Sequence, residues 1–352
     1  MKKESLAFLE ELLSVPSPSG FEQPAQGVVR KYLSGAADEV KTDVHGNVIA
    51  SLNAGAATRV MLAGHVDEIG LMVTHISEKG YIHFAAIGGV DVALVPGQRV
   101  KIHSGRGDIL GVIGKKPIHH MDEEDRKRVP KMRDLWIDIG AKSRKEAQKL
   151  VAVGDCATWT VGFDRLLNNL VVARGFDDRI GAFVAAETLR TLAGRKLPVA
   201  VYAVSTVQEE IGLRGARTSA YGIDPHAGIA IDVGFATDFP DADVKTYGEV
   251  YVGKGPIIAR GANVNPVLGR LLEDSAAKGK IPAQFAGEPR ATGTDANAIQ
   301  VNKSGAAAAL VSIPNRYMHT PVEVVSLDDV DNAVRLLAAT IMAMKPRMDF
   351  TP

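Results

Sequence analysis

Five residues scattered along the chain carry side chains that bind divalent metal ions in proteins. They are His65, Asp177, Glu210, Asp232 and His319. Two imidazoles and three carboxylates suit a hard or borderline divalent cation, and five ligands are one more than a single tetrahedral zinc ion takes. The set therefore indicates two metal ions that share a carboxylate.

Four of these residues come just after apolar segments that we expect to be buried strands. The segments are 59–63 before His65, 199–205 before Glu210, 227–231 before Asp232 and 306–313 before His319. Because α/β sheets collect their functional groups beyond the ends of strands, we expect the ligands to meet at one edge of a sheet.

Carboxylates beside the candidate ligands add a second kind of chemistry. Asp67 follows His65 by two positions on an extended segment, where both side chains point the same way, so Asp67 is placed to orient the imidazole. Glu209 and Glu210 are adjacent and cannot face one site identically, so one of them can bind metal while the other moves protons. A Lewis acid with a nearby general base is the equipment of metal-assisted hydrolysis.

The elements that must position these residues fall into two patterns. Apolar residues at helical spacing predict helices over 4–13, 22–33 and 179–192. Asn265 with Pro266 predicts the start of a helix over 266–279, and Ser326 caps a last helix. Between 71 and 162 the pattern changes to short alternating segments separated by glycine-rich turns, which is typical of a small β-barrel or sandwich. Within this block we expect 119–128 to be a mobile loop, because it is too charged to pack, and a capping box at Ser143 to open a helix that runs to about Leu150.

Because ligands come from both sides of the β-rich block, both sides should belong to one α/β domain. We therefore predict a catalytic α/β domain made of residues 1–70 and 163–352, with residues 71–162 as an inserted β domain. Because this inserted domain supplies none of the five ligands, we expect it to serve oligomer contacts or access to the site.

The composition narrows the partners and the compartment. The chain has 352 residues, of which 46% are hydrophobic, so a large core and two domains are expected. Lys plus Arg and Asp plus Glu are balanced at 41 each, and no segment has the apolar length of a membrane span, so neither nucleic acid nor a membrane is an expected partner. The N-terminus lacks the apolar core of a signal peptide, and the lone Cys156 fits a reducing compartment, so we expect a cytoplasmic protein.

Six short motifs resemble those of the TET (tetrahedral) aminopeptidases, a family of dinuclear metallopeptidases also called glutamyl aminopeptidases and endoglucanase-M-like proteins. The motifs lie at 64–70, 176–179, 208–216, 232–234, 293–296 and 316–321. The resemblance runs from Pro16 to the last helix. It implies an α/β sandwich catalytic domain with a mixed sheet, of the zinc-peptidase type, interrupted by a PDZ-like β-barrel domain.

The resemblance also implies roles for the candidate residues. Asp177 would bridge two metal ions. His65 and Asp232 would complete one metal site, and Glu210 and His319 the other. Glu209 would be the general base, Asp67 would orient His65, and the peptide bond between Asp177 and Asp178 would be cis.

Together these expectations predict that the protein is a metal-dependent aminopeptidase that removes N-terminal residues from short peptides. Each subunit would hold two divalent ions, zinc in the first instance, with cobalt or manganese as alternatives. The resemblance implies dimers that assemble into a tetrahedral dodecamer. Two alternatives stay open on the residues: a related dinuclear amidohydrolase or deacylase, and a non-catalytic scaffold whose metals only hold the fold.

Overall fold

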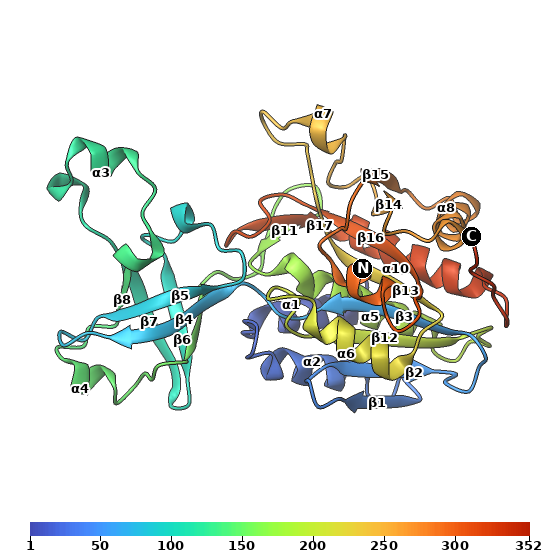
Figure 1. Ribbon diagram of the computed structural model, residues 1–352, viewed down its shortest axis with the longest axis horizontal. Helices are drawn as coiled ribbons and strands as arrows, with labels where there is room; N and C mark the ends of the chain where they lie inside the picture. The colour runs from blue at the N-terminus through green and yellow to red at the C-terminus, as the bar shows by residue number, and fades with distance from the viewer.

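The structure, a computed structural model, describes residues 1–352 and has two unequal parts (Figure 1). The larger part is a sheet with helices on both faces, and the smaller part is a closed barrel that projects from one side of it. This confirms the predicted α/β fold with an inserted β-barrel.

The large sheet has eight strands in the order β1-β2-β12-β3-β13-β16-β14-β15. Its four central strands, β12, β3, β13 and β16, are parallel, and antiparallel pairs flank them on both sides, so the sheet is mixed. The central strands are buried along nearly their whole length, which explains their almost continuous apolar sequences. The strands of this sheet are β1 (Glu39–Thr42), β2 (Val48–Leu52), β3 (Arg59–His65), β12 (Ala200–Thr206), β13 (Ala227–Phe235), β14 (Ile257–Gly261), β15 (Gln284–Glu288) and β16 (Ala307–Asn315).

Helices cover the two faces of the sheet unequally. The main core of 52 buried residues lies on one face, under α1, α2, α5, α8 and α10, and a smaller core lies under α6 and α9 on the other. The predicted helix starts at Asn265 and Ser326 are confirmed, since both side chains accept hydrogen bonds from backbone N–H groups of the first turn. The helices are α1 (Lys3–Ser14), α2 (Gln23–Leu33), α5 (Phe176–Leu192), α6 (Arg214–Ile223), α7 (Val244–Tyr247), α8 (Pro266–Gly279), α9 (Asp295–Gln300) and α10 (Leu327–Ala343).

The barrel closes in the strand order β4-β5-β8-β7-β6-β9 and has its own core of 16 buried residues. A separate three-stranded sheet, β10-β11-β17, lies in the larger part. The remaining strands and short helices are β4 (Gly70–Ile76), β5 (Ile82–Ile87), β6 (Arg99–Ser104), β7 (Gly107–Gly114), β8 (Trp136–Asp138), β9 (Cys156–Trp159), β10 (Asp164–Arg165), β11 (Leu170–Ala173), β17 (Glu323–Ser326), α3 (Glu123–Lys127), α4 (Arg144–Ala147), and the 3-10 turns η1 (Val92–Leu94), η2 (Ile118–His120) and η3 (Met132–Asp134).

Three local expectations were wrong. The charged segment 119–128 contains a helix, α3, because Asp122 caps it and Glu-to-Lys and Glu-to-Arg pairs four residues apart support it. Helix α4 ends at Ala147 rather than near Leu150, and Asp232 lies inside β13 rather than at its end.

No helix combines the length and apolar character needed to cross a membrane. The division at 1–70, 71–162 and 163–352, and the PDZ-like character of the barrel, stay predictions.

Candidate metal centre and substrate pocket

The central parallel strands bring the candidate ligands to one edge of the large sheet. His65 is the last residue of β3 and pairs in register with Thr206, the last residue of β12. Glu209 and Glu210 lie just beyond the end of β12, after Val207 and Gln208, and Asp232 lies on β13, the other neighbour of β3. The five predicted ligands and Glu209 therefore come together in space, although they span most of the chain.

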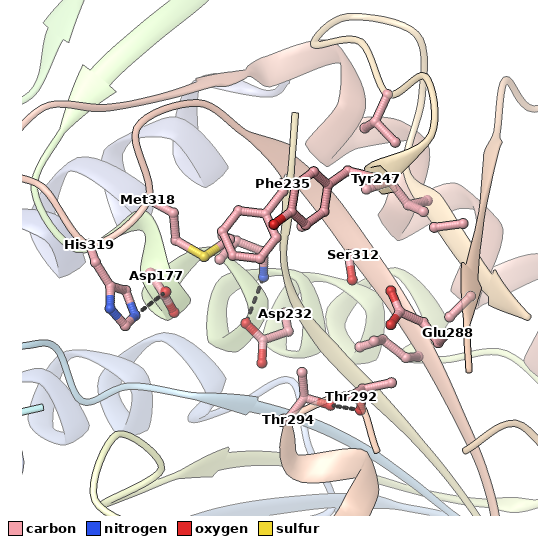
Figure 2. A pocket seen from close by; sticks show the side chains of 18 of the residues that line it. Asp177, Asp232, Phe235, Tyr247, Glu288, Thr292, Thr294, Ser312, Met318 and His319 are labelled. Carbon is pink, nitrogen blue, oxygen red and sulfur yellow. Dashed lines mark hydrogen bonds and ion pairs between the residues drawn. The ribbon is translucent and has the colours of Figure 1, made fainter. Parts of the chain in front are cut away.

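Asp177 lies at the centre of the cluster. It precedes the regular part of α5, where Asp177 and Asp178 have non-helical backbone angles and are joined by a cis peptide bond, as the family resemblance implied. Its Oδ1 is 3.2 Å from Nε2 of His65, and its Oδ2 is 3.1 Å from Nε2 of His319. Each oxygen thus faces a different imidazole, which is the arrangement that a bridging carboxylate requires. Figure 2 shows the contact with His319.

Backbone carbonyl groups hold the other nitrogen of both imidazoles. Nδ1 of His65 is 3.0 Å from the carbonyl oxygen of Asp67, and Nδ1 of His319 is 3.0 Å from the carbonyl oxygen of Gly89. When Nδ1 donates to a carbonyl, the proton of a neutral imidazole sits there and the Nε2 lone pair faces the cluster, as metal binding needs. The Asp67 carboxylate is farther from His65 Nδ1, at 3.4 Å, than the Asp67 carbonyl oxygen.

The cluster divides into two groups of potential ligands. One group is His65, Glu209 and Asp232, and the other is Asp177, Glu210 and His319, with the donor atoms of each group within 4.8 Å of one another. Proximity alone therefore places Glu209 with the first group. Asp177 is in contact with both, because its two oxygens face His65 and His319.

Several buried carboxyl groups of the cluster have raised pKa values, which a nearby cation would lower. Burial raises the pKa of Glu209 to about 9, and burial together with the Asp177 charge raises the pKa of Glu210 to about 8. The Asp177 contact raises the pKa of His319 to about 9. Crowded, buried carboxylates resist ionisation unless a cation balances them, so the donor set is suited to metal ions.

One carboxylate oxygen gives a direct test of that fit. Oε1 of Glu210 is buried and has no hydrogen-bond partner in the protein, although it lies 3.6 Å from Nε2 of His319. A buried polar atom without a partner is costly, and it is rare in native proteins. The residues present therefore fit divalent metal ions, which would give this oxygen its partner.

Two further carboxylates fix the backbone of the cluster. Asp67 accepts hydrogen bonds from the N–H groups of Glu209, at 3.0 Å, and Glu210, at 3.2 Å. Glu323, at the start of β17, accepts from the N–H groups of Asp177 and His319, each at 3.0 Å. Asp67 and Glu323 thus hold two cluster residues each without belonging to either group.

The sequence matches the M42 glutamyl aminopeptidase family over residues 46–336. The chain belongs to the M42 family. A lysyl aminopeptidase of Pyrococcus furiosus is 40% identical over 347 residues, covering 98% of both chains. A TET aminopeptidase from a marine sediment archaeon (Thaumarchaeota archaeon SCGC AB-539-E09) superimposes with a TM-score of 0.93 at 34% identity, covering 97% of each chain.

The TET1 peptidase of Pyrococcus horikoshii, described as assembling into a tetrahedron or a large octahedral shell, superimposes with a TM-score of 0.87 at 32% identity, covering 97% of this chain and 100% of the other. These relatives and the family match show that the chain is a metal-dependent aminopeptidase, a hydrolase that acts on peptide bonds. Family membership implies divalent metal ions as cofactors.

A cavity of about 1020 Å³ opens beside the metal cluster of this M42 peptidase. Figure 2 shows the rings of Phe235 and Tyr247 with Met318 on one side, and Thr292 and Thr294 on the other. The cavity is wide enough for a substrate side chain as well as the peptide group at the metal cluster.

Two contributors to the site were not predicted from the sequence. Glu323 is a charged residue followed by two valines in β17, but the two groups that it binds are remote from it in sequence or lie in a loop. Gly88 and Gly89 follow barrel strand β5, where a side chain at Gly89 would lie 2.7 Å from Nδ1 of His319 and one at Gly88 would lie 3.0 Å from Oε2 of Glu210. The barrel thus contributes backbone, though no ligand side chain, to the metal cluster.

Proposed function

We propose that this chain is a dinuclear aminopeptidase that removes N-terminal residues from short peptides. Two metal ions would share the Asp177 carboxylate, with His65 and Asp232 as the further ligands of one and Glu210 and His319 as the further ligands of the other. The observation that carries the proposal is the placement of the two Asp177 oxygens, each facing the Nε2 atom of a different imidazole. Zinc is our first choice of metal, with cobalt or manganese as alternatives, since carboxylate-rich sites accept all three.

Divalent ions held by these residues would act as Lewis acids that polarise a carbonyl group and make a water molecule more acidic. The protein itself supplies the proton transfers. Glu209 borders the pocket, and its Oε2 lies 3.7 Å from Nε2 of His65. We assign it the role of general base, which takes a proton from the attacking water and passes it to the leaving amine. The hydrogen bond from its N–H to Asp67 fixes its backbone for this task.

The deacylase alternative makes the opposite demand on the substrate. An aminopeptidase needs a free α-amine, whereas a deacylase acts on an acylated one. We expect a short peptide to be shortened one residue at a time from its N-terminus, and the N-acetylated form of the same peptide to be left intact. Mass spectrometry of the products of both reactions distinguishes the two functions. Cleavage of the acetylated peptide at a comparable rate would reject the proposal.

For the whole molecule we propose a soluble cytoplasmic homo-oligomer in which dimers build a tetrahedral dodecamer. The tetrahedral assembly of the related TET1 peptidase supports this, and closed symmetric assemblies are ordinary for homo-oligomers. Light scattering tests the assembly, and a monomer at micromolar concentration would exclude it.

We also propose that residues 71–162 form an inserted PDZ-like domain, since the barrel has its own core. A cooperative melt of residues 71–162 expressed alone would support the domain, whereas an unfolded fragment would count against it.

A further inference from the structure

The floor of the cavity is one face of four neighbouring strands, β13, β16, β14 and β15. In register, Asp232 pairs with Ser312, Ser312 with Ile257, and Ala259 with Ala286. Residues that pair across a sheet point to the same face, as do alternate residues of one strand. The same face therefore carries the metal cluster at Asp232 and, on the outer strand β15, the side chain of Glu288.

Glu288 is the one charged residue lining the cavity outside the metal cluster, and no lysine or arginine lines the cavity at all. In Figure 2, Asp177, Asp232, Ser312 and Glu288 follow one another across the cavity. Glu288 is half-buried, and burial alone raises its pKa, with no hydrogen bond or neighbouring cation to offset the effect. The Glu288 carboxylate therefore has no partner in the protein and is free to bind a cationic group of the substrate.

We propose that Glu288 selects substrates whose first residue is basic, by pairing with the ammonium of lysine or the guanidinium of arginine. The proposal rests on the aminopeptidase function proposed above and adds the substrate class to it. A carboxylate paired with a cation at a partly desolvated site forms a strong, charge-assisted hydrogen bond.

The distance across the sheet excludes the α-amine of the substrate as the group that Glu288 binds. The α-amine sits next to the scissile bond and must stay at the metal cluster. The backbones of β13 and β15 are three strand spacings apart, or about 14 Å at roughly 4.8 Å each, and Glu288 lies further along β15 than Gln284, which is level with Asp232. Only a long side chain that extends from the first residue toward β15 can bring a cation to Glu288.

The surface between the cluster and Glu288 suits the aliphatic part of such a side chain. Ile257, Ala259 and Leu310 line the cavity there, and the small side chains of Ala286 and Ser312 leave room above the sheet. Lysine and arginine bury their methylene stems against apolar surface while the charged end finds a polar partner. An acidic first residue would place a second negative charge beside Glu288, so we expect it to be disfavoured.

The test compares kcat/KM for four aminoacyl 4-nitroanilides, those of lysine, norleucine, leucine and glutamate. Norleucine is the matched probe, because it has the aliphatic stem of lysine without the ammonium. We expect the wild-type enzyme to prefer lysine over norleucine by at least about tenfold. Glu288→Gln should lower this lysine-to-norleucine ratio by about 10–100-fold, the range for a charge-assisted hydrogen bond. Glu288→Lys should reverse the order of lysine and glutamate.

The control variant is Glu39→Gln, which removes one exposed negative charge from β1, the opposite edge strand of the same sheet. It should leave the lysine-to-norleucine ratio unchanged. A wild-type enzyme that cleaves norleucine without preferring lysine would overturn this inference alone, as would an equal fall of the ratio in both variants. A preference for a basic residue in the second position of dipeptides, rather than the first, would overturn it too. A wild-type enzyme that cleaves none of the four substrates would instead overturn the proposed function.

Discussion

At the scale of single residues, the site contains two kinds of side chain. Some face the candidate metal positions, and others hold the backbone of those residues in place. Asp67 and Glu323 each accept two backbone N–H groups, and together these belong to four residues of the cluster. Such supporting groups reduce the freedom of the reactive side chains before substrate arrives. Glu209 and Glu210 are held by the same carboxylate, so different effects of their substitutions must come from their side chains.

We predict that Glu209→Gln keeps both metal ions and lowers kcat by roughly 10²–10⁴-fold, the usual contribution of a general base. Glu210→Gln should weaken the binding of one metal ion, because it replaces a charged ligand with a neutral amide. Metal content by elemental analysis, measured beside the rate, distinguishes the two. If Glu209→Gln lost metal and Glu210→Gln retained it, the roles assigned to this pair would have to be exchanged.

At the scale of elements, the loop after β5 joins the barrel to the metal cluster. The Gly89 carbonyl oxygen contacts His319, and there is no room for a side chain at this position. The barrel therefore positions a candidate ligand in addition to any role in access or assembly.

We predict that Gly89→Ala displaces His319 and lowers metal affinity or activity by about 10–100-fold, as loss of a partner behind a metal ligand commonly does. Gly105→Ala is the matched control, because it lies in another loop of the barrel with open space around it. Competition with a chelator measures the metal affinity of both variants. Equal metal affinities for Gly89→Ala and the wild type would show that the contact between Gly89 and His319 does not contribute to metal binding.

Local sequence patterns predicted the elements well where one strong signal acted alone. Asn265 with Pro266 and Ser326 marked helix starts, and alternating apolar residues marked the barrel. Four of the five predicted ligands came together because the central parallel strands end at one edge of the sheet, whereas Asp177 comes from the start of α5. Glu323, Gly89 and Glu288 were not predicted, because each acts through partners that only the tertiary fold brings near. Segment 119–128 was misjudged because its charges stabilise a helix rather than preventing one.

At the scale of the whole molecule, stability and chemistry have separate sources. The main core consists of 52 buried apolar residues, whereas the predicted metal ligands gather at one edge of the sheet. Because burial of apolar surface supplies most of the stability of a domain of this kind, the fold should persist when the metal ions are removed. This separates the enzyme from a scaffold whose metals hold it together.

The central claim, that two metal ions act together in a site built on Asp177, is tested most directly by titrating metal into chelated protein. Turnover of a free-amine peptide and the circular-dichroism spectrum are followed at each addition of zinc. We predict that helix and strand content stays constant throughout and that activity rises until two ions are bound per chain. Full activity at one ion per chain, or a chain that is unfolded until metal is added, would contradict the account.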